Sequence, residues 1–219
     1  MNNSIELKNI SKNYSSSKKI EVFKNINFTF KAGKIYSLIG PSGSGKSTLL
    51  NLISLIDKPS SGFIKLDNIK INDNDNDQRD MIRSKKIGII YQDKNLLSDF
   101  TTLENVYMAR LSLDNNKKKA VFDAKNVLKK VGLDKRLNHF PNELSGGESQ
   151  RVAISRALIN SPDIILADEP TGNLDHKNAS DIFNLLFSLK NKKRIIIFAT
   201  HNRYFADMSD CKLSLIDGK

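Results

Sequence analysis

A glycine-rich segment at residues 40–47 contains the residue types that bind phosphate. It reads Gly-Pro-Ser-Gly-Ser-Gly-Lys-Ser and fits the pattern G-x-x-x-x-G-K-[ST] at every position. Glycines let the backbone approach an anion closely, and successive N–H groups then point toward it. The ammonium of Lys46 can reach the β- and γ-phosphates, and the hydroxyl of Ser47 can bind Mg²⁺. The predicted nucleotide contacts here are Gly40, Pro41, Ser42, Gly43, Ser44, Gly45, Lys46, Ser47 and Thr48.

Two adjacent carboxylates follow an apolar run at residues 164–167. In open parallel sheets, ligands bind beyond the carboxyl ends of the strands, so Asp168 is placed to hold Mg²⁺ directly or through water. Glu169, one residue further, is placed to orient and polarise an attacking water. An acidic pair that merely caps the next turn is the alternative. The phosphate loop in the same chain favours the Mg²⁺ and water-activating roles.

A third candidate is the start of a helix at residues 144–148, which read Leu-Ser-Gly-Gly-Glu. Ser145 is an N-cap candidate, and Glu148 stands three residues later, as in a capping box. Gly146 and Gly147 leave backbone N–H groups uncovered at the positive end of the helix, which is suited to a second phosphate. An ordinary capped helix explains the serine and the glutamate. It does not explain two adjacent glycines in a first turn, because glycine lowers helix stability.

Short apolar runs predict the strands that position these residues. A strand at 35–39 is consistent with burial in a parallel sheet, and a second buried strand is expected at 87–91. Further strands are expected at 164–167, 195–200 and 212–216. The alternating segment 5–10 predicts an edge strand, 26–30 predicts a second alternating strand, and 63–71 predicts a further strand or hairpin arm. The polar repeat at 72–80 predicts a loop. The leucine-rich segment after the phosphate loop predicts a buried helix, and another helix is expected at 179–189.

Residues 92–160 differ from the rest because strand patterns disappear and helical patterns replace them. We therefore expect one domain over residues 1–219, in which an α/β core of about 1–91 and 161–219 is interrupted by a helical subdomain of about 92–160.

Composition indicates the cellular environment of the protein more than its function. The net charge of +11 suits nucleotide, anionic lipid or nucleic acid, but a lysine-rich solvated surface explains it equally well. Cys211 is the single cysteine, so no intramolecular disulfide forms, as in a reducing cytoplasm. No signal peptide begins the chain, and no run approaches the ~18 apolar residues of a membrane span. We expect another chain to anchor the protein if it works at a membrane.

The motifs and their order resemble the ATP-binding cassette (ABC) family from about Ile5 to the end of the chain. Residues 144–151 resemble its signature motif, with Glu148 in the fifth place. The resemblance implies an α/β fold: a P-loop NTPase core with a mainly parallel sheet, an N-terminal antiparallel β subdomain and the inserted helical subdomain. It also implies ATP and Mg²⁺ as ligands, and ATP hydrolysis to ADP and phosphate. A non-hydrolysing cassette is the alternative, against which the intact motifs argue.

The same resemblance assigns further residues. Gln92 matches the glutamine of the Q-loop, which would contact Mg²⁺ and the γ-phosphate, and Asp175 matches the acid of the D-loop. His201 matches the switch histidine, and Tyr14 matches the aromatic that stacks on adenine. The implied catalytic residues are Lys46, Glu169 and His201. The implied ATP contacts include Ser145, Gly146, Gly147 and Glu148, supplied by a second copy in a head-to-tail homodimer.

Two segments narrow the resemblance within the family. Residues 95–106 are similar to the Q-loop continuation of lipoprotein-releasing ATPases of the LolD type, and 167–175 are similar to that group and its relatives. This implies a peripheral subunit on the cytoplasmic side of the inner membrane, working with integral membrane permeases of the LolC/LolE type. No nucleic-acid partner is expected, and only 99 positions separate Lys46 from Ser145, too few for the coiled coils of chromosome-maintenance relatives. The alternatives are a cell-division ATPase of the FtsE type and a macrolide-export ATPase.

Overall fold

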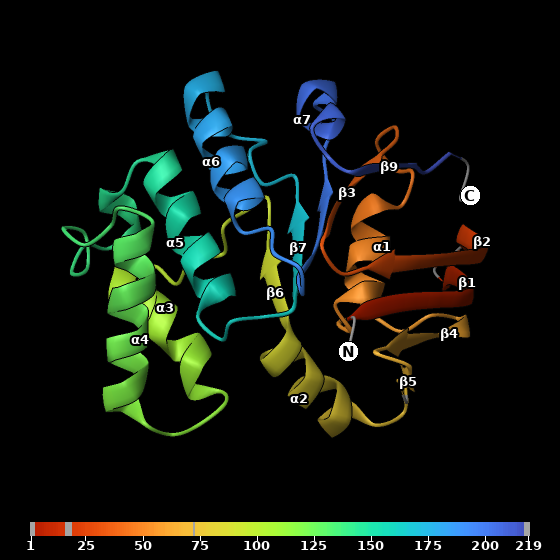
Figure 1. The fold of residues 1–219 in the computed structure, drawn as a ribbon, viewed down its shortest axis with the longest axis horizontal. Helices are drawn as coiled ribbons and strands as arrows, with labels where there is room; N and C mark the ends of the chain where they lie inside the picture. The colour runs from red at the N-terminus through yellow and green to blue at the C-terminus, as the bar shows by residue number, and fades with distance from the viewer. Residues whose placement is uncertain (1–2, 16–18, 72, 217–219) are drawn as a thin grey trace.

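The computed structural model describes residues 3–15, 19–71 and 73–216 of the chain. A parallel sheet at its centre has the strand order β6-β7-β8-β3-β9 (Figure 1). Its strands are β6 (Ile87–Ile90), β7 (Ile164–Asp168), β8 (Ile195–Ala199), β3 (Lys34–Ile39) and β9 (Cys211–Ser214). All four pairings are parallel, and the inner strands are almost wholly buried, as their continuous apolar runs predict. The expected α/β class is confirmed.

A smaller antiparallel sheet lies beside it, with the order β2-β1-β4-β5. Its strands are β1 (Ser4–Ser15), β2 (Lys19–Lys31), β4 (Ser61–Leu66) and β5 (Ile69–Lys70). The expectation that residues 5–10 form an edge strand was wrong, because β1 pairs with both β2 and β4. Alternating polar and apolar residues report that one face of a strand is buried. They carry no information on whether both of its edges are paired.

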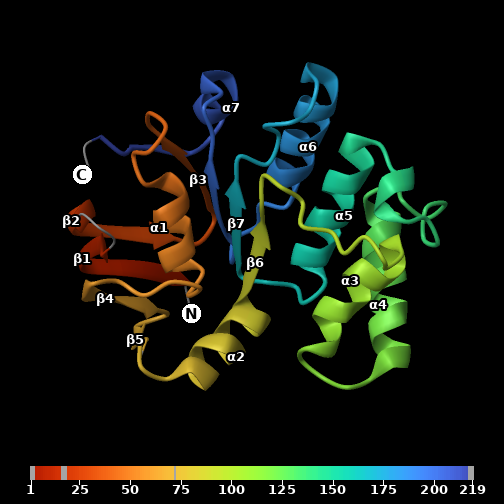
Figure 2. The same ribbon diagram turned by 180° about the vertical axis from the view of Figure 1, so that it is seen from behind.

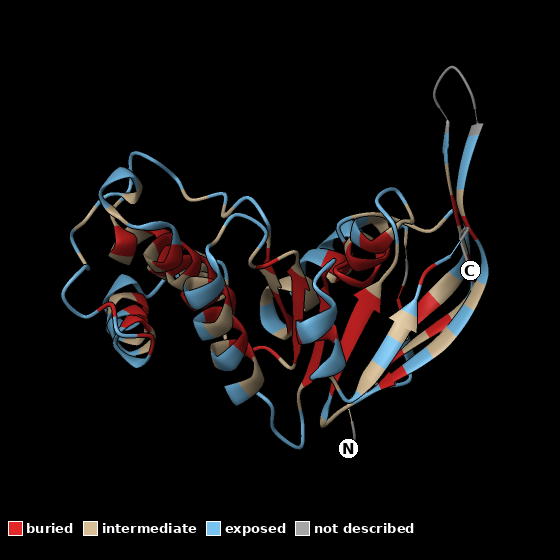
Figure 3. Ribbon diagram, turned by 90° about the horizontal axis from the view of Figure 1, so that it is seen from above, coloured by how far each residue is buried: buried red, intermediate tan, exposed pale blue. Residues whose placement is uncertain are grey.

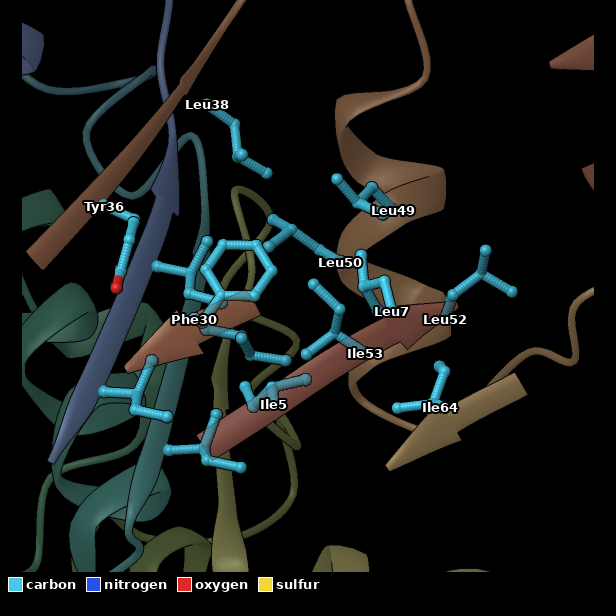
Figure 4. Packing of buried hydrophobic residues seen from close by; sticks show 14 of the residues in the cluster. Ile5, Leu7, Phe30, Tyr36, Leu38, Leu49, Leu50, Leu52, Ile53 and Ile64 are labelled. Carbon is cyan, nitrogen blue, oxygen red and sulfur yellow. The ribbon is translucent and has the colours of Figure 1, made fainter. Parts of the chain in front are cut away.

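Helix α1 (Lys46–Ile53) lies between the two sheets (Figure 2). Leu49, Leu50, Leu52 and Ile53 are all buried, and they pack with Ile5 and other side chains of both sheets (Figure 4). A helix with apolar residues nearly all round is therefore buried, as expected, and the structure places it between the two sheets. Each buried leucine contributes about 1.5–3 kcal/mol. This packing fixes the start of α1, and with it the loop that precedes the helix.

Helix α2 (Asn76–Lys86) occupies part of a segment that was expected to be a loop. The expectation for 72–80 was wrong from Asn76 onward, and residue 72 lies outside the described residues. The Asp75 side chain accepts a hydrogen bond from the backbone of Gln78 and caps the helix. Arg79 is buried and donates to the carbonyl of Leu55. A polar composition predicts a loop, but a cap and a buried arginine stabilise this helix through tertiary contacts.

The remaining helices form two groups (Figure 1), and Figure 3 shows buried residues on helices as well as on strands. Helices α3 (Thr102–Leu111), α4 (Lys117–Lys130) and α5 (Gly146–Leu158), with the short 3₁₀ helix Pro141–Glu143, surround a cluster of their own that includes Val106, Leu128 and Val152. Helices α6 (His176–Ser188) and α7 (Arg203–Asp207) cover the parallel sheet on the face opposite α1. No helix in the described part of the chain is long and apolar enough to cross a bilayer.

Candidate nucleotide-binding site

Four strands of the parallel sheet end at the same edge, because they all run in one direction. Strand β3 leads into the phosphate loop, β7 ends in Asp168 and Glu169, β8 leads to His201, and β6 leads to Gln92. A hollow of ≈ 290 Å³ at this edge is lined by Val22, Ser42, Gly43, Gly45, Lys46, Ser47, Thr48, Gln92, Asp168, Glu169 and His201. Residues that are up to 179 positions apart in the sequence thus share one site.

The phosphate loop is held by its own lysine and by the start of α1. Lys46 is buried, and its Nζ donates to the carbonyl oxygens of Gly40 and Pro41, at 3.0 Å each. Gly45 precedes α1 with φ +97°, and a Cβ there would stand 2.6 Å from the ring of Phe23. No side chain caps α1. The first N–H groups of this helix are therefore available to an anion, which the helix dipole also attracts.

Glu169 lines the hollow and has one carboxylate oxygen without a hydrogen-bond donor among the described residues. Its backbone is in the left-handed region with φ 42°, and Oε2 accepts a hydrogen bond from the backbone N–H of His201 at 3.3 Å. Nε2 of His201 lies 3.2 Å from Oε1, but Oε1 is buried and has no aligned hydrogen-bond donor among the described residues. Burial raises the pKa of Glu169, and the nearby His201 and Lys46 oppose that rise. The arrangement suits a base that binds and polarises a water.

Asp168 fits the role of a Mg²⁺ ligand. Its Oδ1 is buried and has no hydrogen-bond partner among the described residues. Ser47 and Gln92, the other two predicted ligands, line the same hollow. Nowhere in the described ranges do three His, Cys, Asp or Glu side chains cluster as in a metal site made by protein alone. A magnesium ion at this position would take its remaining ligands from phosphate and water, as Mg²⁺ commonly does.

The predicted capping box at the start of α5 is present. Oγ of Ser145 accepts from the backbone N–H of Glu148 at 3.2 Å, and the Glu148 carboxylate accepts from the N–H of Ser145 at 2.9 Å and pairs with Arg136 at 2.8 Å. Gly146 is exposed, whereas Gly147 is buried. A Cβ at Gly147 would stand 2.6 Å from Oδ1 of Asn178 on α6. The second glycine therefore also permits close packing of α5 on α6.

The capping box gives a pH-dependent contribution to stability. The hydrogen bond from the Ser145 backbone, aided by Arg136, lowers the pKa of Glu148 from 4.5 to about 2. A carboxylate with a lowered pKa stabilises the fold above its unfolded pKa and loses that effect as pH falls toward the folded value. We expect Glu148→Gln to cost about 1 kcal/mol at neutral pH, because solvent screens the pair. Urea unfolding should show this cost shrink below pH 4.5; a constant difference would contradict it.

Three of the sequence-predicted groups lie outside this hollow. Ser145, Gly146 and Gly147 are not among the described residues that line it. Asp175 instead caps α6 and accepts hydrogen bonds from the backbone of Lys177 and Asn178. Tyr14 lies on β1, and its hydroxyl donates to Asp57. One chain thus brings together the phosphate loop, Gln92, the carboxylate pair and the histidine, but not the second phosphate-binding helix start.

Sequence reasoning missed residues that hold the site together. Arg156 on α5 donates to the carbonyl oxygens of Asn95 and Lys94, at 2.6 and 2.7 Å, and so anchors the segment that follows Gln92. A Cβ at Gly172 would stand 3.0 Å from Nε2 of Gln92, so this glycine leaves room for the glutamine. No sequence motif identifies these contacts, because each joins elements that are distant along the chain.

A phosphate loop between a parallel strand and a helix, facing a strand that ends in Asp-Glu, defines the P-loop class of nucleoside triphosphatases. Residues 23–172 match the family model of the ABC transporter. The chain belongs to the ABC transporter family, as its ATP-binding and ATP-hydrolysing subunit.

The similar proteins agree with this assignment. The lipoprotein-releasing system ATP-binding protein LolD of Rickettsia felis is 47% identical over 213 residues, which are 96% of this chain and 94% of that protein. The structure described as a dimeric MJ0796, an ABC transporter cassette, has a TM-score of 0.89 and 42% identity, covering 98% of this chain and 95% of that one. MJ0796 in a post-hydrolysis state bound to ADP and Pi has a TM-score of 0.89 and 41% identity, with the same coverage.

Proposed function

We propose that this chain is the ATPase of a transporter that releases lipoproteins from the inner membrane, and that it works as a homodimer with two ATP molecules between the subunits. We infer the homodimer from the site of a single chain, which is incomplete. The hollow at the phosphate loop is not lined by Ser145, Gly146 or Gly147, although these residues present a second helix start. In a head-to-tail pair, the partner's copy of this helix start would close each site.

Within the site, each side chain has a proposed role. Lys46 leaves the carbonyls of the phosphate loop to bind the β- and γ-phosphates. Glu169 accepts a proton from the attacking water at Oε1, and His201 hydrogen-bonds the γ-phosphate and holds Glu169 in place. Ser47, Gln92 and Asp168 would hold Mg²⁺, which when bound neutralises charge on the phosphate oxygens. Positioning and electrostatics of this kind account for most catalysis of phosphoryl transfer.

Binding and hydrolysis would then drive association and separation of the two copies. ATP that touches both subunits stabilises the closed dimer by mass action. Loss of the γ-phosphate removes part of those contacts, so the closed state is no longer favoured. The structures of MJ0796, one described as dimeric and one as a dimer bound to ADP and Pi, support this cycle by similarity.

Similarity to LolD proteins supports the proposal that the cargo is a lipoprotein and that the partner is a membrane permease. Besides the Rickettsia relative, LolD of Cytophaga hutchinsonii is 42% identical over 91% of this chain. A groove of ≈ 690 Å³ between α2, β6 and the ends of α3 and α5 is lined by Met81, Leu113, Arg156 and other side chains. We assign it to the permease pair of the LolC/LolE type. Leu97 and Phe100 are exposed and follow Tyr91, a residue of the groove lining, by six and nine positions. Leu96 instead packs into the helical subdomain of residues 92–160.

Reconstitution tests this proposal. The chain is purified with the membrane proteins encoded beside it, placed in liposomes that carry a lipoprotein, and supplied with Mg·ATP. We expect lipoprotein to leave the vesicles only with ATP and only with native Glu169. ATP-dependent transport of a macrolide, without lipoprotein release, would favour the export alternative. ATP hydrolysis that depends on a peptidoglycan-hydrolase regulator would favour cell division.

A further inference from the structure

Resemblance to the ABC family implies that Tyr14 stacks on the base of the nucleotide, and the structure fixes its side chain on two sides. Its hydroxyl donates to Oδ2 of Asp57 at 2.9 Å. Nζ of Lys12 lies over its ring, 4.7 Å from the centroid. The side chain is still 40% exposed, so part of it remains open to a ligand. Burial and the bond to Asp57 raise the pKa of Tyr14, so the phenol is protonated at neutral pH and donates this hydrogen bond.

Asp57 is itself held from three directions. Its Oδ1 accepts from Nζ of Lys12 and from the backbone N–H of Lys58, both at 2.7 Å. Its backbone N–H donates to the carbonyl of Asn51 on α1 at 3.1 Å. Its own carbonyl accepts from the buried Arg79 of α2 at 2.8 Å. Two donors hold Oδ1, and two further hydrogen bonds hold the backbone of the same residue. The carboxylate therefore has little freedom and fixes the group that its second oxygen binds.

Helix α1 connects this carboxylate to the phosphate loop. The loop runs directly into the first residue of α1, and Asp57 follows the last helical residue, Ile53, by four positions. The helix is packed between the two sheets, so its two ends keep a constant separation. Through its bond to Asp57, Tyr14 on β1 of the antiparallel sheet is thus held at a fixed distance from the phosphate loop, which follows a strand of the parallel sheet.

We propose that Asp57 and Lys12 are positioning residues that hold the Tyr14 ring at a fixed place relative to the phosphate loop, so that it stacks on the base of the bound nucleotide. This inference rests on the base-stacking role that the family resemblance implies for Tyr14. Lys12 occupies one face of the ring and leaves the other for the base. A cation on the far face draws electron density toward itself, which strengthens stacking with an electron-rich purine.

A purely structural role for Asp57 is the competing explanation. Lys12 is 7% exposed, and a buried ammonium needs a partner whether or not Tyr14 binds a base. In that case Asp57→Asn lowers stability and weakens every ligand to the same degree. Positioning of Tyr14 predicts instead that only the contribution of the base is lost. The two explanations are separated by ligands with and without a base.

The experiment measures binding of ATP and of inorganic tripolyphosphate by calorimetry, with Mg²⁺, to the full chain and its variants. Base stacking on an aromatic side chain contributes about 1–3 kcal/mol, which corresponds to about 5–150-fold in affinity. We expect Tyr14→Ala to weaken ATP within that range, and Asp57→Asn to weaken ATP by about 5–20-fold. Tripolyphosphate affinity should stay within about twofold in both variants.

Two further variants control the result. Glu6 lies on β1, as Tyr14 does, and pairs with Lys8 and Lys65 at 3.0 and 3.2 Å. Glu6→Gln, like Asp57→Asn, therefore removes a carboxylate that is paired with a lysine of β1. It should change neither affinity. In a Tyr14→Phe background, which lacks the hydroxyl, Asp57→Asn should add little to the loss of ATP affinity. The Lys12→Met, Asp57→Asn double variant leaves no buried charge unpaired and serves if the single variant does not fold.

The outcomes distinguish the two levels of the proposal. Unchanged ATP affinity in Tyr14→Ala overturns both the stacking and the positioning. A weakened Tyr14→Ala together with native ATP affinity in Asp57→Asn overturns the positioning alone. Equal weakening of ATP and tripolyphosphate in the folded Asp57 variants assigns Asp57 a structural role and also overturns it. Selective weakening of ATP, absent in Glu6→Gln, supports it.

Discussion

Replacement of Glu169 by glutamine is expected to slow ATP turnover by about 10²–10⁴-fold and to leave ATP binding close to native. Glutamine keeps the shape of the side chain and its acceptor for the His201 N–H, at 3.3 Å in the native chain, but it cannot accept a proton from water. Because bound ATP then persists, the closed dimer should accumulate. Turnover is measured by phosphate release, and dimer formation with Mg·ATP by light scattering.

The same substitution should stabilise the chain in the absence of nucleotide. Burial raises the pKa of Glu169 above 4.5, so holding the group ionised at neutral pH costs folding free energy. That cost grows as pH rises from the unfolded pKa toward the folded pKa and is constant above it, and the neutral glutamine does not incur it. Glu169→Gln should therefore unfold at a higher temperature than the native chain, with a gap that widens from acidic to neutral pH. Glu21→Gln, at an exposed position on β2, is the matched control.

Near-native turnover in Glu169→Gln would remove Glu169 from the role of base. Slow turnover without a closed dimer would leave that role intact and contradict the proposed closure by two ATP molecules. The two results are independent, since proton transfer happens within one site and closure requires two chains.

Replacement of Lys46 by alanine should weaken ATP binding itself. A charge-assisted hydrogen bond contributes about 1.5–3 kcal/mol, which predicts a loss of about 10–150-fold in affinity. Lys46 is buried, and its Nζ lies 3.0 Å from two carbonyl oxygens of the phosphate loop, so it is already held at the loop that would bind the phosphates. Titration with a fluorescent ATP analogue measures the effect. Lys24→Ala, an exposed lysine on β2, should bind as the native chain does.

Arginine at position 46 separates charge from fit. A guanidinium keeps the positive charge but is planar and wider than an ammonium, and it does not replace a point charge in a tight loop. We therefore expect Lys46→Arg to bind ATP more weakly than the native chain. Unchanged nucleotide affinity in Lys46→Ala would show that the loop at residues 40–47 binds phosphate through its backbone alone, and the assignment of Lys46 would be wrong.

The sequence determined the class of fold and predicted most of the residues that line the hollow at the phosphate loop. Apolar runs at 164–167 and 195–200 predict buried parallel strands, and the parallel direction then brings Asp168, Glu169 and His201 to one edge. The phosphate loop and the capping box at Ser145 depend on residues next to each other in the chain. Local patterns of this kind are readable in one dimension because neighbouring residues alone create them.

Tertiary structure decided what distant segments do to one another. It placed β1 inside its sheet, formed a helix from Asn76 in a segment expected to be a loop, buried Gly147 against Asn178, and joined Asp57 to Tyr14 across 43 positions. No periodicity or motif records these contacts, because each depends on how two independently formed elements pack. Residue types and local spacing determine the chemistry of a site, whereas the contacts that position its side chains form only when the chain has folded.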